Sequence, residues 1–282
     1  MLATFLWMIG TILSFSLMAI AGRELSNQIN TFELLFFRGL FGLIVITMII
    51  RLSKNSQCFQ TTQFKGHLIR NSFHFLGQYA WFIGLGLLPL AQVFAIEFTV
   101  PFWTAIIAAI FLNERLTFIK VSAILIAFGG VILIVQPSLD HFDSASVIVL
   151  GAAIFYACAH SSTKYLAKHN HPLTILFYMC LIQTPIAGIL MLTHWTMPTL
   201  FEWAWISVVA LTALSAHFCM TKAMLTSSVT TVVTLDFMRL PLIAIIGYFI
   251  YHEPFGIWAM VGSTVILFAM LLNFKSPVNK PC

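Results

Sequence analysis

The chain has 282 residues and a formal net charge of +5; 60% of its residues are hydrophobic, only 8% are charged, and the mean hydropathy is +0.97. A soluble domain usually carries about 25% charged residues, so this composition excludes a water-soluble surface and favours a protein that is surrounded by lipid. The basic residues form no stripe interleaved with exposed aromatic residues, so nucleic acid is not an expected partner.

Ten apolar runs follow one another along the chain, and each is long enough for a membrane-spanning helix, which needs about 20 mostly apolar residues. We expect these helices at residues 2–21, 31–50, 68–87, 90–112, 117–136, 145–166, 173–193, 201–221, 229–250 and 256–274. The runs are continuously apolar and lack the alternation of a transmembrane barrel. The predicted fold class is therefore an all-α integral membrane protein with ten transmembrane helices.

The distribution of positive charge predicts how these helices are oriented. Of the 14 Lys and Arg residues, Arg38 and Arg239 lie inside predicted helices. With the N-terminus in the cytoplasm, only Arg23 falls in an outer loop, and the inner loops and tail hold Arg51, Lys54, Lys65, Arg70, Arg115, Lys120, Lys164, Lys168, Lys222, Lys275 and Lys280. Positive residues collect on the cytoplasmic side of membrane proteins, so both termini are predicted to be cytoplasmic.

The fourth and ninth predicted helices are similar in sequence. At an offset of 139 residues the aligned pairs are Glu97 with Asp236, Phe98 with Phe237 and Glu114 with Glu253, while Pro101 misses Pro241 by one residue. A weaker match pairs residues 79–91 with 216–228 at an offset of 137. Five helices per repeat is an odd number, so the two halves must cross the membrane in opposite directions, as in many secondary transporters.

We divide the chain into a first repeat (1–137), a second repeat (141–274) and a short cytoplasmic tail (275–282). We expect the two terminal glutamates, Glu114 and Glu253, to make equivalent contacts within their own halves.

Motifs in both halves are similar to those of a transporter family. In the first half they are Phe36-Phe37-Arg38, Leu88-Pro89-Leu90-Ala91, Phe98-Thr99-Val100-Pro101-Phe102, Leu112-Asn113-Glu114-Arg115, and the run from Gly129-Gly130-Val131 to Gln136-Pro137. In the second half they are Asp236-Phe237-Met238-Arg239-Leu240-Pro241, Gly247-Tyr248, His252-Glu253-Pro254, and Gly262 through Ile266. Over essentially its whole length the chain resembles the drug/metabolite transporter superfamily, in the form with two EamA-type domains. It departs from that family at Asn113 and His252, where glycine is common.

This resemblance implies two inverted five-helix EamA-type repeats around a central cavity, with no ATP-hydrolysing subunit, in a bacterial inner membrane. The pattern is most similar to a branch that includes S-adenosylmethionine and riboflavin carriers and some metallophore exporters. It implies alternating-access transport of a small organic metabolite, such as S-adenosylmethionine or a similar zwitterionic or heterocyclic compound; an amino-acid or other metabolite exporter of the same fold is the alternative. The substrate, the direction of transport, a coupling proton or ion, and a homodimer are left open.

A membrane enzyme or a non-transporting assembly factor is the alternative from another class. The sequence has no HExxH or GxSxG motif and no paired acids with metal-binding spacing, and its five cysteines have no CxxC spacing. Neither an enzyme, nor a metal site, nor a cofactor is therefore expected. An assembly factor would be expected to carry a soluble partner-binding segment, and the short connections leave no room for one.

Four charged residues inside the predicted helices are the main candidates for substrate binding or coupling: Arg38, Glu97, Asp236 and Arg239. A charge in the bilayer costs about 3 kcal/mol or more, so it is normally paired or faces a cavity. Asp236 and Arg239 are three residues apart and can pair on one helix face, and Arg38 lies at a depth that suits Glu97. We expect the two arginines to hold an anionic group of the substrate and the two acids to bind an amine or a coupling proton. The alternative is that all four form structural ion pairs.

A second set of candidates is polar or aromatic. His74, Gln78, Tyr79 and Trp81 in the third predicted helix are expected to form a cavity wall, and His217 in the eighth is expected to act similarly. The alternative for the histidines is an ordinary hydrogen bond in the interior of the helix bundle.

Two tryptophans and two prolines complete the candidate set. Trp7 and Trp103 are candidates to stack on a flat substrate ring, or else they fill core or lipid-facing space. Pro101 and Pro241 are expected to kink their helices, and such kinks either expose carbonyl groups and act as hinges or serve packing alone. The polar run at 160–164, by contrast, is expected to be interfacial.

Overall fold

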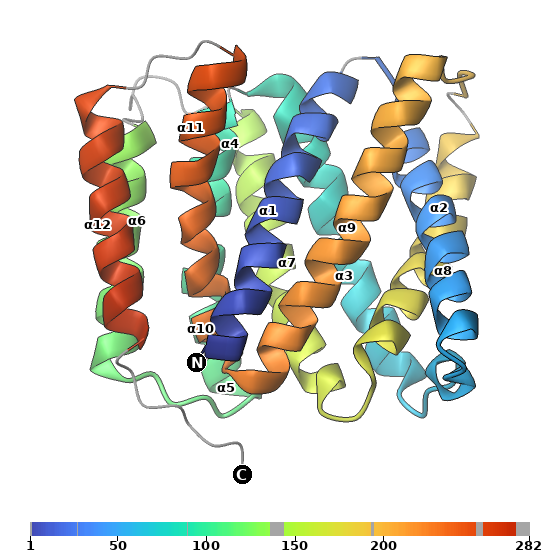
Figure 1. Ribbon diagram of the computed structural model, residues 1–282, viewed down its shortest axis with the longest axis horizontal. Coiled ribbons are helices and arrows are strands. Elements are labelled where there is room, and N and C mark those ends of the chain that lie inside the picture. Colours follow the sequence, from blue (N-terminus) through green and yellow to red (C-terminus); the bar gives the residue numbers. More distant parts are fainter. Residues whose placement is uncertain are drawn as a thin grey trace.

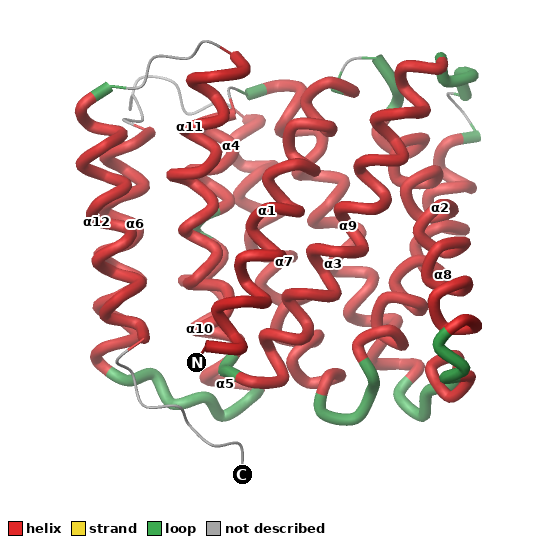
Figure 2. The backbone as a smooth tube through the Cα atoms, viewed as in Figure 1, coloured by secondary structure: helices red, strands yellow, loops and turns green. Residues whose placement is uncertain are grey.

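A computed structural model describes residues 2–26, 28–88, 90–135, 144–192, 195–251 and 256–274. Within these ranges all regular secondary structure is helical, and short loops join the helices (Figure 2). The predicted all-α fold class is confirmed.

The first half contains α1 (Leu2–Leu25), α2 (Thr31–Leu52), the short 3₁₀ helix η1 (Ser56–Phe59), α3 (Phe64–Leu87), α4 (Leu90–Glu97), α5 (Val100–Phe111) and α6 (Phe118–Val135). The second half contains α7 (Ser144–Ala167), α8 (Pro172–Met191), α9 (Leu200–Thr226), α10 (Val229–Leu235), the 3₁₀ helix η2 (Asp236–Met238), α11 (Arg239–Tyr251) and α12 (Ile257–Phe274). Helix α1 begins and α12 ends at the same end of the bundle, the lower one in Figure 1, as an even number of crossings requires.

Seven helical segments of the described chain are long and apolar enough to cross a membrane, and two of them are the joined segments Val93–Phe111 (α4–α5) and Val229–Ile250 (α10–α11). Helices α6 and α12 are apolar over the shorter stretches Phe118–Ile134 and Met260–Ala269. Helix α3 has 24 residues, as many as α1, but it buries several polar side chains. These helices account for the ten predicted crossings, and α3 is the crossing whose composition is least suited to lipid.

The two halves interlock rather than forming separate bodies. Extensive contacts pair α1 with α9 and α3 with α7. These two pairs are equivalent in the repeat, because α1 corresponds to α7 and α3 corresponds to α9. The remaining large contacts pair α2 with α8 and α6 with α12, which are the same helix of each half. Helices α6 and α12 lie together at one edge of the bundle, and α2 and α8 lie near the opposite edge (Figure 1). The fold is therefore an inverted repeat, as the sequence predicts.

Two glycines show how closely the edge pair packs. A Cβ atom at Gly130 of α6 would lie 2.8 Å from the carbonyl oxygen of Gly262, and one at Gly262 of α12 would lie 2.6 Å from the carbonyl oxygen of Gly130. Both distances are too short for a real carbon, so only glycine allows these two backbones to approach so closely, as at other small-residue helix contacts in membranes.

The fourth and ninth crossings are broken rather than merely kinked. The first break lies at Phe98–Thr99 between α4 and α5, and the second is the 3₁₀ turn η2 between α10 and α11. Pro101 is in the first turn of α5, where a missing N–H leaves no helical hydrogen bond unmade. Pro241 is the third residue of α11. Both prolines therefore follow a break, and both candidate acids are at one: Glu97 is the last residue of α4 and Asp236 is the first residue of η2.

Candidate functional site

A small cavity of about 40 Å³ lies where the two halves meet. Its lining residues come from both halves and are Phe15, Met18, Arg38, His74, Gln78, Trp81, Phe82, Glu97, Tyr156, His160, His217, Met220, Asp236 and Arg239. A water molecule needs roughly 10–15 Å³ measured in this way, so the cavity has room for a few waters. Eight of the sequence-predicted site residues share this one cavity.

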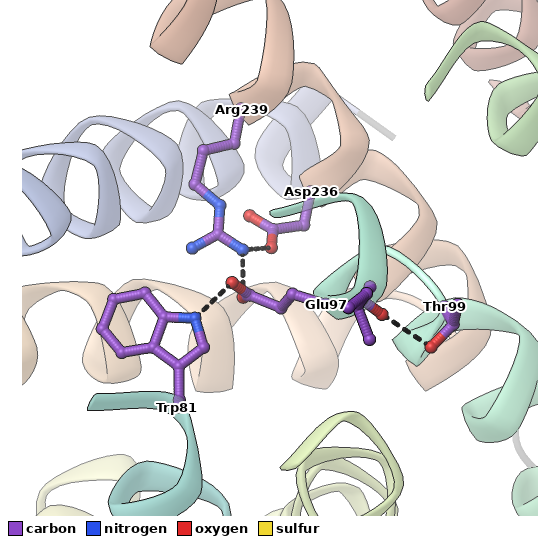
Figure 3. Close-up of polar contacts among 6 residues, drawn as sticks. Trp81, Glu97, Thr99, Asp236 and Arg239 are labelled. Carbon is purple, nitrogen blue, oxygen red and sulfur yellow. Dashed lines mark hydrogen bonds and ion pairs between the residues drawn. The ribbon is translucent and has the colours of Figure 1, made fainter. Parts of the chain in front are cut away.

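Glu97, Asp236 and Arg239, which line the cavity, form an ion-paired cluster (Figure 3). The Nη2 atom of Arg239 lies 2.5 Å from Oε1 of Glu97 and 2.9 Å from Oδ2 of Asp236. The indole N–H of Trp81 donates to Oε2 of Glu97 at 2.7 Å. One guanidinium therefore serves two carboxylates, and with all three groups ionised the cluster carries a net charge of −1.

Aromatic rings surround the guanidinium of Arg239. Its central carbon lies 5.3 Å from the ring centre of Phe15 and 5.5 Å from the ring centres of both Phe94 and Phe98. A cation within about 6 Å of such rings is attracted by their π electrons. Even so, Nε of Arg239 and Oδ1 of Asp236 are buried and have no hydrogen-bond partner among the described residues. The cluster therefore retains one donor and one acceptor that a ligand can use.

The broken helices position this cluster. Glu97 ends α4, and its side chain extends from the break toward the second half (Figure 3). The carbonyl oxygen of Ile96 at the break accepts from both the backbone N–H of Thr99 at 3.0 Å and its hydroxyl at 2.7 Å. Because Asp236 begins η2 and Arg239 directly follows it, one turn of 3₁₀ helix places both on the same face.

Arg38 belongs to a different network, centred on Gln183 of α8. Its Nη2 donates to Oε1 of Gln183 at 3.2 Å, and the same oxygen accepts from Nε2 of Gln78 at 2.9 Å. The amide nitrogen of Gln183 donates to Oδ1 of Asn71 at 2.9 Å. The expected pairing of Arg38 with Glu97 is therefore wrong: Glu97 pairs with Arg239, whereas Arg38 contacts a neutral amide from the other half. The expected pairing of Asp236 with Arg239 is confirmed.

His74 and His217 connect this network to the rest of the cavity. Their Nε2 atoms are 3.1 Å apart, and both rings are buried. The Nδ1 atom of His74 faces the amide nitrogens of Gln78 and, at 3.0 Å, Gln183. Because those nitrogens are donors, Nδ1 accepts, and Nε2 of His74 carries the hydrogen that it donates to His217. The histidines thus form a hydrogen-bonded link between α3 and α9.

The aromatic candidates lie elsewhere. Tyr79 stacks on Phe32 with ring centres 4.3 Å apart, and Trp7 meets Phe218 edge to face at 5.9 Å. The indole N–H of Trp103 donates to the hydroxyl of Thr99 at 3.2 Å. None of these three is among the residues that line the central cavity in the described structure.

Several residues of the site were not predicted from the sequence. Tyr156 and His160 of α7 line the cavity, although the run that begins at His160 was expected to be interfacial. Gln183 and Asn71 anchor the Arg38 network. Arg70, which was counted as a loop charge, is only 2% exposed and donates to Thr163 and Asn71. Amide side chains within apolar runs were the available signal, because polar groups in a membrane are costly unless they have partners.

The described residues contain no group of three or more His, Cys, Asp or Glu arranged to hold a metal ion.

The terminal glutamates were expected to make contacts within their own halves. Glu114 instead accepts from the backbone N–H of Val229 at 2.9 Å and from the hydroxyl of Thr230 at 2.9 Å, so it caps α10 of the second half. Glu253 lies outside the described residues.

Comparisons with known proteins agree with this architecture. The chain is 25% identical over 271 residues to an S-adenosylmethionine uptake transporter of Rickettsia bellii, covering 96% of this chain and 92% of that protein. It is 27% identical over 283 residues to a riboflavin transporter of Vibrio cholerae, covering 98% and 94%. It is also 25% identical over 260 residues to a pseudopaline exporter of Pseudomonas aeruginosa, covering 92% and 91%. These relatives are named as transporters and not as enzymes.

A solved crystal structure shows the same fold. It is 16% identical to this chain, with a TM-score of 0.80 over 97% of this chain and 99% of that one. Residues 2–136 and 143–275 each match the EamA-like transporter family, so the match covers both halves. The chain therefore belongs to the EamA-like transporter family, and it is a multi-pass membrane protein that transports a small molecule.

Proposed function

We propose that this protein carries a small zwitterionic metabolite of the S-adenosylmethionine type across the bacterial inner membrane by alternating access. The observation that supports this most is the charge pattern of the central cavity. The cluster of Glu97, Asp236 and Arg239 is net negative, and Arg38 is a separate positive charge on the same cavity. A ligand with one positive and one negative group complements both.

Riboflavin is the second candidate substrate, because several relatives are named riboflavin transporters. Its ring and sugar chain are uncharged at neutral pH, so they leave the charges of the cavity unpaired. S-adenosylmethionine carries a sulfonium, an ammonium and a carboxylate together with a flat adenine ring. The rings of Phe15 and Tyr156 in the cavity wall offer surfaces for that adenine.

The size of the cavity implies that the helices separate when substrate binds. Sites for small organic molecules usually measure about 300–1,000 Å³, whereas this cavity measures about 40 Å³. Glu97 and Arg239 join a broken helix of the first half to one of the second half. A substrate cation or a proton that binds Glu97 weakens this ion pair. In our mechanism, substrate binding therefore also releases the contact that holds the two halves together.

We place both termini on the cytoplasmic side. The exposed basic residues Arg51, Lys54 and Lys168 lie at or beside the loops at the end of the bundle where α1 begins. Their positive charge supports a cytoplasmic location for that end.

Uptake into proteoliposomes tests the proposal. Purified protein should accumulate radiolabelled S-adenosylmethionine well above empty liposomes, and riboflavin should not compete. Glu97→Gln should lower the rate at least about tenfold, because it removes the negative charge that binds the substrate cation and pairs with Arg239; tenfold corresponds to about 1.4 kcal/mol. Glu202→Gln is the matched control, since Glu202 caps the start of α9 away from the cavity. The proposal fails if wild-type protein moves no S-adenosylmethionine, or if Glu97→Gln moves it at the wild-type rate.

A further inference from the structure

We infer that Arg38 and Gln78, both anchored on Gln183, form a subsite for the α-amino-acid head of the substrate, with its carboxylate on Arg38 and its ammonium on Gln78. This inference rests on the proposed function, because it concerns the same cavity and the same class of ligand.

Arg38 is a buried cation without an acidic partner. Its side chain is 5% exposed, and no carboxylate of the described residues forms an ion pair with it. Its Nη2 binds the neutral oxygen of Gln183, and its Nε has no hydrogen-bond partner. Buried charges are normally paired or face a cavity. Arg38 faces one, so an anionic group of a ligand is the missing partner that its surroundings indicate.

Gln78 offers the opposite chemistry close by. Its amide nitrogen is used, because it donates to Oε1 of Gln183 and shares its other hydrogen between Nδ1 and the carbonyl oxygen of His74. Its own Oε1 is buried and without a partner, and the residue lines the same cavity as Arg38. A free acceptor beside a free cationic donor matches the ammonium and the carboxylate that an amino acid carries on one carbon.

Gln183 fixes the two groups relative to each other. Its oxygen accepts from both Arg38 and Gln78, and its nitrogen donates to Asn71 at 2.9 Å. With both ends of the amide engaged, Gln183 cannot rotate without breaking several buried hydrogen bonds, and each of these is costly to leave unmade. Gln183 is therefore a positioning residue: it holds Arg38 and Gln78 side by side and does not itself contact the ligand.

The subsite and the acidic cluster line the same cavity. A substrate whose amino-acid head binds Arg38 and Gln78 presents any further cation, such as a sulfonium, to Glu97 and Asp236. An amino-acid head with a distant positive centre therefore satisfies both parts of the cavity, whereas a compound that lacks the carboxylate satisfies only one.

Two compounds that differ by one carboxylate test this inference: S-adenosylmethionine and its decarboxylated form. Wild-type protein in proteoliposomes should prefer the intact compound by at least about tenfold, because a site built to bind a polar group rejects an analogue that lacks it. Arg38→Gln should lower uptake of S-adenosylmethionine by a similar factor, leave the decarboxylated compound nearly unchanged, and so abolish the preference. Arg38→Lys should restore part of it. Arg51→Gln, an exposed arginine on the same helix, should change neither.

Gln183→Glu provides a second variant that keeps the shape of the amide. The new carboxylate pairs with Arg38 from within and competes with the substrate carboxylate, so the same selective loss is expected even if Arg38→Gln does not fold. If wild-type protein transports S-adenosylmethionine but Arg38→Gln and Gln183→Glu still prefer it over the decarboxylated compound, the subsite inference is overturned and the proposed function stands. If wild-type protein transports neither compound, the proposed function itself fails.

Discussion

The two broken crossings occupy equivalent places in the inverted repeat, but they contribute unequally to the site. Each carries an acid at its break, Glu97 in one and Asp236 in the other. Only the second carries a base, because position 100, which aligns with Arg239 at the offset of 139, is valine. Arg239 therefore pairs both with the acid of its own helix and with the acid of the other half.

The edge helices α6 and α12 show the contrasting behaviour. There the two halves contribute the same residue type, Gly130 and Gly262, and each glycine packs on the backbone of the other. Symmetry is thus kept where helices must pack and lost where charge is placed. We interpret the loss as functional, because two acids with one shared base leave a net negative charge that a symmetric pair of ion pairs would not.

The largest effect is expected from Arg239→Gln, which removes the shared base and leaves both acids buried without a counter-charge. Breaking a buried ion pair from one side typically costs about 3–5 kcal/mol. The thermal midpoint in detergent should fall strongly and uptake should be lost, while Arg51→Gln changes neither. The double variant Arg239→Gln with Glu97→Gln should recover part of the stability but none of the transport. If Arg239→Gln is as stable as wild type, the shared-base interpretation is wrong.

A smaller effect is expected where the repeat keeps its symmetry. Gly130→Ala places a methyl group against the backbone of α12 and should cost about 1–3 kcal/mol through overpacking. Gly262→Ala should cost a similar amount, because the contact is reciprocal. Gly129→Ala is a matched control on the same helix, since a Cβ atom there meets nothing within 4 Å. Thermal unfolding of the three variants measures this, and equal behaviour of Gly129→Ala and Gly130→Ala would falsify the close contact.

Much of the fold could be predicted because apolar run length and an odd helix number per repeat are properties of the sequence alone. The acids Glu97 and Asp236 could be found for the same reason, as charges in apolar surroundings. The residue that pairs with Glu97 could not be predicted in this way. Depth in the membrane ranked Arg38 as a partner for Glu97, but depth says nothing about which face of a helix a side chain occupies, and Gln183 of the other half contacts Arg38.

Helix ends and contacts between the halves were also not predicted correctly from the sequence. Hydropathy placed the start of the third crossing at residue 68, but α3 begins at Phe64. Arg70, counted with the loop charges, is buried in α3 and donates to Thr163 of the second half. Glu114 was expected to contact its own half and instead caps α10 of the other. Each of these errors concerns interlocking of the two repeats, which comparison of one repeat with the other cannot reveal.

The smallest expected effect comes from making the first half more like the second. Trp81 donates to Glu97, whereas its counterpart at the offset of 137 is Phe218, which has no N–H group to donate. Trp81→Phe keeps most of the aromatic packing and removes one hydrogen bond to a carboxylate, which should cost about 1–2 kcal/mol. Arg239 still pairs with both acids, so substrate uptake should persist at a reduced rate. Tyr79→Phe on the same helix is the control, because Tyr79 stacks on Phe32 outside the cavity lining. If Trp81→Phe abolishes uptake as completely as Arg239→Gln does, then the indole N–H is as essential to the acidic cluster as the shared base, and the asymmetry of the site extends to α3.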